Sequence, residues 1–277
     1  MRCLVEWPTS ARETSPVTHA DTESTRGHSE FVSAVADRMG LGSAVHEPGT
    51  SVVAADDRSG SSMVVAYSIS AHTVLWCDPA IAGALAELAD ASITKPLDEI
   101  GAWGERSGWR HISSAYMQLL RSSGIVRPRA DASIVIRPLD RRNAQHIAMI
   151  DGFKAVLSDD DRDEADLDRP DLDDHILAVV DEQGIAAFAS QRPFVYADQF
   201  ADIAIATRPD TRGRGLGRIA VAALCDEIGS TDMVPLYRCD THNQGSVRLS
   251  ASLGFVPVIT VLALEYHSTT PDDEGSG

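Results

Sequence analysis

The sequence lacks the marks of a membrane, secreted or metal-binding protein. No apolar run approaches the roughly 20 residues that a helix needs to cross a bilayer, and the opening residues MRCLVEWPTS contain no signal-peptide core. The four cysteines, Cys3, Cys77, Cys225 and Cys239, form no CxxC pair, which favours reduced thiols over a disulfide framework. No histidine spacing predicts a metal site. We therefore expect a cytoplasmic protein without a bound metal.

Basic residues are also scarce. The 277 residues include 24 Lys and Arg against 41 Asp and Glu, which gives a net charge of −17. Such a composition argues against binding to nucleic acids, which requires a basic face that neutralises phosphates, and against binding to anionic membranes. The same charge permits a cationic substrate, although acidity also serves solubility alone.

Aromatic side chains make up only 5% of the sequence, whereas hydrophobic residues make up 43%. This predicts a core of Ala, Val, Leu and Ile in one large domain or two small ones. Polar composition predicts disordered tails over residues 1–28 and 269–277. Between the tails we place an N-terminal unit at 29–130 and a second unit at 131–268, with the linker RSSGIVRPRAD at their boundary.

Hydrophobic periodicity and turn residues predict the elements of the N-terminal unit. We expect a helix over 31–39, a hairpin of strands 51–55 and 63–69, a strand over 72–76, a helix over 78–90 opened by Asp78 and Pro79, and helical structure over 97–120. This α/β unit is either an unrelated accessory domain or a degenerate copy of the second unit, with which it shares a loose order of elements.

In the second unit, hairpins occur beside a crossover, which predicts an α+β or mixed α/β fold. The expected strands cover 133–136, 175–180, 185–190, 202–207, 234–239 and 256–266, and the expected helices cover 140–156, 215–228 and 244–253. The segment 159–174 holds ten acidic residues and two arginines. We predict a solvated loop there, with recognition of a polycationic amine as the alternative.

The segment TRPDTRGRGLG, from Thr207 to Gly217, joins a predicted strand to a predicted helix. Its glycines let the backbone approach an anion without an intervening Cβ, and the first amide groups of the helix have no intrahelical acceptor. Together with the helix dipole these groups make an anion site, to which Arg212 and Arg214 add positive charge. The alternative interpretation is a glycine-rich turn with solvent-exposed arginines.

Two motifs here resemble the GNAT superfamily of acyl-CoA-dependent N-acetyltransferases. The run Arg212-Gly213-Arg214-Gly215-Leu216-Gly217 fits the family's pyrophosphate loop, Gln/Arg-x-x-Gly-x-Gly/Ala. The pattern Asn-x-x-Ala/Ser-x-x-Leu-Tyr-x-x-x-Gly-Phe of the family's next helix is matched by Asn243, Ser246, Leu249, Gly254 and Phe255. The resemblance covers about residues 134–266. It implies a GNAT-like fold, a mixed and mostly antiparallel sheet flanked by helices, which splays after the strand that ends at Thr207.

The resemblance also implies a chemistry, the direct transfer of an acyl group, usually acetyl, from acyl-CoA to an amine in a ternary complex. The implied cofactor-binding residues are Ile205, Ala206, Thr207, Arg212, Gly213, Arg214, Gly215, Leu216, Gly217 and Asn243. Asp202 stands where several members carry a glutamate base. Ser250 stands where the family usually carries a tyrosine that protonates the leaving thiolate. Because a serine hydroxyl is far less acidic than a phenol, the pattern lacks its usual acid.

Two other functions remain open. The run from Gly215 to Ala220 also matches the GxGxxA of a Rossmann dinucleotide site, with Asp240 twenty residues beyond Ala220, although Gly215 lies eight residues beyond Thr207 rather than directly after the strand. The serine at position 250 is also compatible with an acyl-CoA-binding regulatory protein without catalysis. The acceptor, a small-molecule or peptide amine, is not identified by the sequence, and a homodimer is compatible with it.

Overall fold

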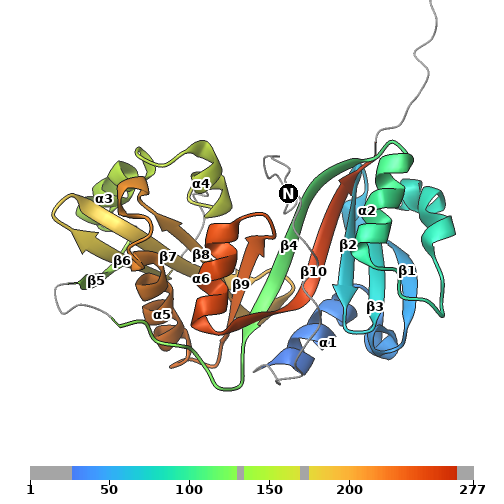
Figure 1. Ribbon diagram of the computed structural model, residues 1–277, viewed down its shortest axis with the longest axis horizontal. Coiled ribbons are helices and arrows are strands. Elements are labelled where there is room, and N and C mark those ends of the chain that lie inside the picture. The colour runs from blue at the N-terminus through green and yellow to red at the C-terminus, as the bar shows by residue number, and fades with distance from the viewer. Residues whose placement is uncertain (1–26, 130–133, 169–174, 267–277) are drawn as a thin grey trace, which may run out of the picture. The chain divides into compact units, whose positions relative to one another are not determined.

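The computed structural model describes residues 27–129, 134–168 and 175–266, which fall into two compact units. Within these ranges, unit 1 comprises residues 39–114 and 260–266, and unit 2 comprises residues 27–38 and 115–259. Strands β4 (Arg110–Leu120) and β10 (Phe255–Glu265) contribute residues to both units (Figure 1).

Unit 2 is an α+β unit built on a mixed sheet. Besides parts of β4 and β10, it contains α1 (His28–Arg38), β5 (Val135–Leu139), α3 (Ala144–Lys154), α4 (Asp159–Glu164), β6 (His175–Asp181), β7 (Gly184–Phe194), β8 (Ala197–Thr207), η4 (Pro209–Thr211), α5 (Leu216–Ile228), β9 (Val234–Asp240) and α6 (Gln244–Leu253). Its strand order is β10-β4-β9-β8-β7-β6-β5. The β8–β9 pair is parallel, whereas β4–β9 and the successive pairs from β5 to β8 are antiparallel.

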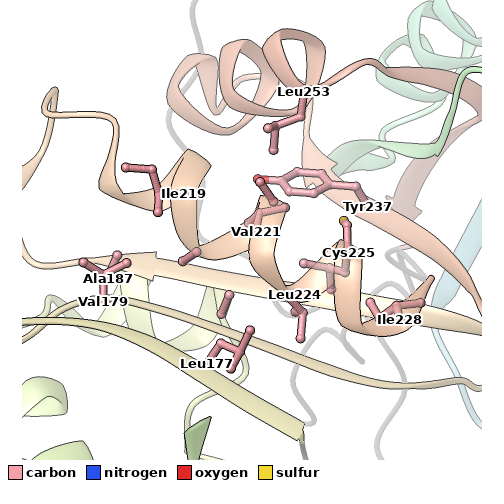
Figure 2. Packing of buried hydrophobic residues seen from close by; sticks show 14 of the residues in the cluster. Leu177, Val179, Ala187, Ile219, Val221, Leu224, Cys225, Ile228, Tyr237 and Leu253 are labelled. Carbon is pink, nitrogen blue, oxygen red and sulfur yellow. The ribbon is translucent and has the colours of Figure 1, made fainter. Parts of the chain in front are cut away.

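The two faces of this sheet bury different helices because successive side chains of a strand alternate between faces. On β6, Leu177 and Val179 join the cluster around α5, which Figure 2 shows from close by. Ile176 and Ala178, which alternate with them along the strand, pack instead with Phe153 of α3. Unit 2 thus has helices on both faces, and its core is rich in Ala, Val, Leu and Ile, as the composition predicts.

Strands β8 and β9 are paired over only part of their length. The parallel ladder runs from Phe200 opposite Val234 to Ile203 opposite Tyr237, and the last four residues of β8 have no partner on β9. Those residues are still paired with β7, up to Thr207 opposite Ala187. The sheet therefore splays toward Thr207, as the resemblance implied.

Unit 1 is a smaller mixed sheet covered by helical segments. It contains η1 (Gly42–His46), β1 (Gly49–Ala54), η2 (Asp56–Arg58), β2 (Met63–Ile69), β3 (His72–Cys77), η3 (Pro79–Leu88) and α2 (Leu97–Arg106). Its strand order is β1-β3-β2-β10-β4. Its core includes Leu75 of β3, Leu85 of η3, Ile100 of α2 and Leu264 of β10. Strand β10 thus completes the sheet of unit 1, so this unit is not built from N-terminal residues alone.

Most of the predicted elements are confirmed, and three predictions are wrong. Residues 51–55 and 63–69 do not form a hairpin, because β1 pairs in parallel with β3 while β2 pairs with β3 in antiparallel fashion. The predicted helical structure over 97–120 ends at Arg106, and Gly108, at φ +76°, leads into strand β4. The acidic segment predicted as a loop over 159–174 begins instead with six residues that form α4, and its residues 169–174 lie outside the described residues.

The predicted domain boundary near residue 130 and the two compact units divide the chain differently. Helix α1 belongs to unit 2, where Phe31 packs against Phe200 with ring centroids 4.9 Å apart. Of the predicted tails, 1–26 and 269–277 lie outside the described residues, while Gly27 and His28 belong to the start of α1. No helix within the described ranges is long and apolar enough to span a membrane.

Candidate functional site

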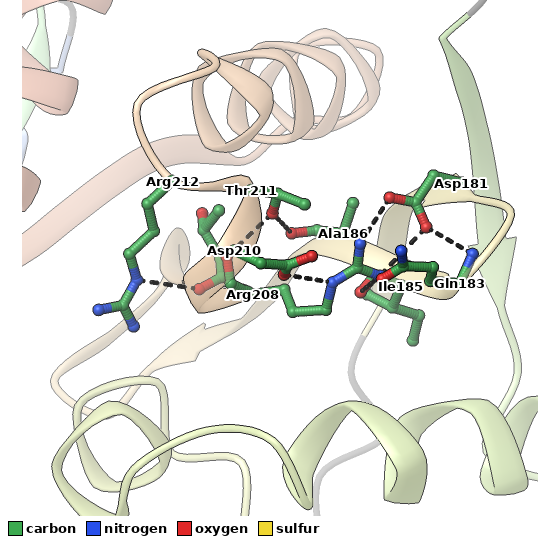
Figure 3. A network of polar contacts seen from close by, with 9 residues as sticks. Asp181, Gln183, Ile185, Ala186, Arg208, Asp210, Thr211 and Arg212 are labelled. Atoms are coloured by element: carbon green, nitrogen blue, oxygen red, sulfur yellow. Dashed lines mark hydrogen bonds and ion pairs between the residues drawn. The ribbon is translucent and has the colours of Figure 1, made fainter.

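The loop after β8 is held in place by a buried arginine that the sequence did not single out. Arg208 is 7% exposed. Its Nη1 and Nη2 donate to the two carboxylate oxygens of Asp181 at 3.1 and 2.6 Å, and its Nε donates to Asp210 at 2.7 Å. The hydroxyl of Thr211 donates to the carbonyl oxygen of Ala186 at 3.0 Å. These contacts, drawn in Figure 3, fix the loop to the β6–β7 turn.

The same network shifts the pKa of its carboxylates. Hydrogen bonds from Arg208 lower the pKa of Asp181 below its ordinary value, against an opposing effect of partial burial. Arg208 likewise lowers the pKa of Asp210. Both carboxylates are therefore held in the charged form that neutralises Arg208. Arg208 and Thr211 lie within the segment predicted to bind the pyrophosphate, but their side chains instead anchor the loop to β6 and β7.

The start of α5 has the backbone of an anion site. Gly213 and Gly215 both adopt φ +77°, a left-handed conformation that suits glycine, and a Cβ added at either would meet nothing within 4 Å. No side chain caps α5, in contrast to α3, α4 and α6, which Asn143, Ser158 and Asn243 cap. The first amide groups of α5 are thus left to an external acceptor.

Leu216 and Gly217 pack against neighbouring elements and are not exposed to a ligand. Leu216 is buried in the core cluster around α5. A Cβ on Gly217 would lie 2.9 Å from Thr207 Oγ1 and 3.1 Å from Leu249 Cδ1. Glycine at position 217 therefore allows α5 to approach β8 and α6 closely.

The two predicted loop arginines differ in their partners. Arg212 pairs with Asp161 of α4 at 2.7 Å, and its Nε donates to the carbonyl oxygen of Thr207 at 3.2 Å. Arg214 is exposed. One loop cation is therefore already neutralised by a carboxylate, and the other faces solvent.

The end of β8 presents alternate backbone groups to the two neighbouring strands. Arg208 N–H donates to Ala186 of β7 at 3.0 Å, so by strand alternation the backbone of Ala206 also faces β7 and that of Ile205 and Thr207 faces away from it. The side chain of Ala206 is buried among residues of α3 and β6. Of the three predicted strand residues, Ile205 and Thr207 therefore offer backbone groups to the splay, and Ala206 does not.

Asn243 lies across the splay from the loop, where β9 leads into α6. Its Oδ1 accepts from the backbone N–H of Ser246 at 2.9 Å, which caps α6. Its Nδ2 donates to Glu164 of α4. Both ends of this predicted ligand-binding side chain are thus engaged within unit 2.

Ser250 does not offer a proton to a ligand. It is 0% exposed, and its hydroxyl donates to Gln118 of β4 and to the carbonyl oxygen of Val247, both at 3.0 Å. Tyr237 does not replace the missing acid, because it is fully buried and hydrogen-bonded to Ser246 at 2.8 Å. Tyr266 packs against Trp109 in unit 1. Serine at position 250 is therefore a packing residue.

Asp202, the predicted base, is enclosed by two arginines. It is 5% exposed. Arg238 donates to its two oxygens at 2.8 and 2.6 Å, and Arg192 donates to Oδ2 at 3.2 Å. Both carboxylate oxygens are thus occupied by guanidinium donors, with no access for a substrate. This geometry fits a structural ion pair and argues against a base.

The contribution of α4 was not predicted from the sequence. Asp161 and Glu164, one helical turn apart, contact Arg212 and Asn243 on the two sides of the splay. The signal was present in the sequence, since Ser158 and Asp161 form a capping box that predicts a helix start. The high density of charge in the segment obscured it.

A Rossmann site does not fit this geometry. Gly215 caps α5 eight residues beyond the end of β8, after a separate helical turn at η4. Strand β8 is antiparallel to β7 and parallel only to β9, whereas a dinucleotide-binding half is built from successive parallel strands. In the parts of the chain that the structure describes, no cluster of His, Cys, Asp and Glu is arranged to hold a metal ion.

Comparison with known proteins agrees with the motif-based resemblance. Residues 177–261 match the family model of GNAT acetyltransferases. No curated protein matches the chain. The match spans the chain from β6 to β10 and so includes the splay, the loop and α6.

Solved structures show weak similarity. A GNAT-family acetyltransferase from Novosphingobium aromaticivorans is 19% identical with a TM-score of 0.40, and the match covers 58% of this chain and 69% of that chain. A GCN5-related N-acetyltransferase from Kribbella flavida is 17% identical with a TM-score of 0.45, covering 60% and 63%. The acetyltransferase yncA from Salmonella typhimurium, solved with acetyl-CoA, is 22% identical with a TM-score of 0.34, covering 52% and 100%. Because these scores are low, the structural matches carry no argument, and the similarity to GNAT acetyltransferases rests on the match of residues 177–261 to the family model.

Proposed function

We propose that this protein transfers an acyl group, usually acetyl, from acyl-CoA directly to an amine. The observation that carries the proposal is the start of α5, where an uncapped helix, two left-handed glycines and Arg214 lie at the point where β8 and β9 diverge. A diphosphate suits this place, because amide groups at a helix N-terminus and a nearby cation both stabilise negative charge.

The splay suits the rest of the co-substrate. Backbone groups of Ile205 and Thr207 face away from β7 and have no partner on β9. An extended pantetheine arm can hydrogen-bond to such groups in the manner of an added strand. For this contact the guanidinium of Arg212 has to leave the carbonyl oxygen of Thr207, to which it now donates.

Amine acceptors fit the charge of the protein. The net charge of −17 favours a cationic partner over an anionic one. The acidic helix α4 lies against residues on both sides of the splay. We place the acceptor there, as a small-molecule or peptide amine, with the protein acting as a cytoplasmic enzyme and without nucleic acid or membrane partners.

The test is binding followed by turnover. Calorimetry with the full chain is expected to show one acetyl-CoA per chain, with no binding of NADH. Release of free CoA is then followed with spermidine, kanamycin, lysine and a peptide with a free N-terminus. Binding without release on a broad amine panel would instead identify an acyl-CoA-binding protein. Binding of NADH but not of acetyl-CoA would refute the proposal.

A further inference from the structure

Helix α4 spans the splay and carries a carboxylate that faces it. Asp161 contacts Arg212, which follows β8, and Glu164 contacts Asn243, which follows β9. Because residues three apart share one face of a helix, both carboxylates lie on the side of α4 that faces the divergence of the two strands. The family match begins at residue 177 and does not include α4.

Glu164 differs from the other carboxylates at this place in what holds it. Asp202 is clamped by two arginines, and Asp161 is paired with Arg212. Asp240 accepts from the backbone N–H and the ring Nδ1 of His242. Glu164 has a neutral amide donor on Oε1, and among the described residues no cation pairs with it and no group donates to Oε2. One of its oxygens is therefore available to a substrate.

The surroundings of Glu164 favour a group that exchanges protons. Burial raises the pKa of Glu164, and the carboxylates of Asp240 and Asp161 act in the same direction, whereas the Asn243 amide and Arg212 oppose the shift. Cys239 and Tyr237 also face it, and the carboxylate of Glu164 contributes to the raised pKa of both. The protonated and charged forms of Glu164 are thus closer in free energy than for an exposed glutamate, as a general base requires.

We propose that Glu164 is the general base of the acyl transfer, taking the proton from the acceptor ammonium directly or through one water. This inference rests on the proposed function and names the residue that activates the amine.

The acceptor ammonium gives one proton to Glu164 Oε2, and the neutral nitrogen forms a bond to the thioester carbonyl carbon. The carbon–sulfur bond then breaks, with its electron pair going to sulfur. The second proton lost by the nitrogen passes to that thiolate, which gives an amide and free CoA. Glu164 returns its proton to solvent. No oxidant, metal or further reactant is required.

The test variant is Glu164→Gln, which keeps the oxygen that accepts from Asn243 and removes the basicity. The matched control is Asp163→Asn on the same helix, an exposed residue whose change removes the same charge. Each is assayed with whichever amine of the panel the wild-type protein accepts. Acetyl-CoA affinity is measured in parallel, because a folded, binding-competent variant is required for the comparison.

We expect Glu164→Gln to bind acetyl-CoA normally and to lower the transfer rate near neutral pH by about 10² to 10⁴-fold, the usual contribution of a general base. The wild-type kcat/KM should level off above the pKa of Glu164. The variant should show no plateau and should rise in proportion to the neutral amine. Asp163→Asn should behave as wild type.

Three results would overturn the inference. The variant could retain the wild-type rate and plateau. It could lose rate only in proportion to lost acetyl-CoA affinity, which indicates a structural role. Lastly, Asp202→Asn could remove the plateau while Glu164→Gln keeps it, which would assign the base to Asp202. If the wild-type protein transfers to no amine of the panel, the proposed function itself fails, and this outcome is distinct from the other three.

Discussion

Gly215 offers the sharpest test of the anion site at the start of α5. It caps the helix at φ +77° and ψ 8°, and an added Cβ would meet nothing within 4 Å. Any other residue there bears the strain of the left-handed conformation, about 1 to 2 kcal/mol, but it causes no clash. Gly215→Ala and Gly215→Glu should therefore both fold, with Tm lowered by roughly 2 to 4 °C per kcal/mol of strain.

The two variants should separate in their affinity for acetyl-CoA. The glutamate carboxylate would stand beside a bound diphosphate. A repulsion between unit charges about 4 Å apart, at an effective dielectric constant of about 20, amounts to about 4 kcal/mol. Gly215→Glu should thus weaken binding by roughly 10³-fold. Gly215→Ala carries the strain without the charge and should lose far less.

Calorimetric titration of acetyl-CoA measures this difference. The matched control is Gly108→Glu in unit 1, where glycine has φ +76° and again nothing within 4 Å of an added Cβ. It introduces the same strain and the same charge in the other unit. Unchanged affinity in Gly215→Glu, or an equal loss in Gly108→Glu, would refute the assignment of the pyrophosphate to the start of α5.

Two further predictions concern the neighbours of the loop. Asp161→Asn removes the carboxylate that now neutralises Arg212, so it should tighten acetyl-CoA binding by about 1 kcal/mol, roughly fivefold. The gain should be smaller at high salt. Weaker binding than wild type in calorimetry would contradict this prediction. Asp181→Asn removes the negative charge and one of the two hydrogen bonds that Asp181 accepts from Arg208, and it should lower the free energy of unfolding near neutral pH by about 1.5 to 3 kcal/mol. The pKa of Asp181 is lowered in the folded protein, so its contribution to stability is present above the unfolded pKa of about 3.9 and is lost as pH falls through the folded pKa. The free energies of unfolding of the two proteins, measured with urea, should therefore converge in acid. A difference that grows in acid would be inconsistent with the ion pair.

Local signals predicted much of unit 2. The period of apolar residues placed α5 and α6 within a residue of their observed bounds, and turn residues placed the β6–β7 hairpin. The glycines at 213 and 215 predicted a backbone open to an anion, and the structure adds that both adopt a left-handed conformation. Such features depend on residues close together in the chain, so they can be inferred from the sequence.

Unit 1 shows where local signals fail. The turn between β1 and β2 looks like a hairpin turn, yet β3 lies between the two strands in the sheet. Residues 110–120 have no strong period of their own and become a strand, part of which pairs with β9. Pairing between distant segments is decided by the free energy of the whole sheet, and local propensity gives way to it.

The sequence by itself predicted the resemblance to GNAT acetyltransferases, through motifs whose spacing reflects a backbone conformation and a helix start. Only the tertiary structure decided the role of each polar side chain. Asp202 and Ser250 stand where GNAT acetyltransferases usually carry catalytic residues. In this structure Arg192 and Arg238, from other strands, pair with Asp202. The hydroxyl of Ser250 is likewise engaged by Gln118 of another strand. Within its acidic segment Glu164 could not be distinguished from its neighbours by sequence, and only the fold places it beside Asn243, 79 residues away in the chain. Ion pairing and burial join residues far apart in the chain, and a single sequence does not record which of them meet.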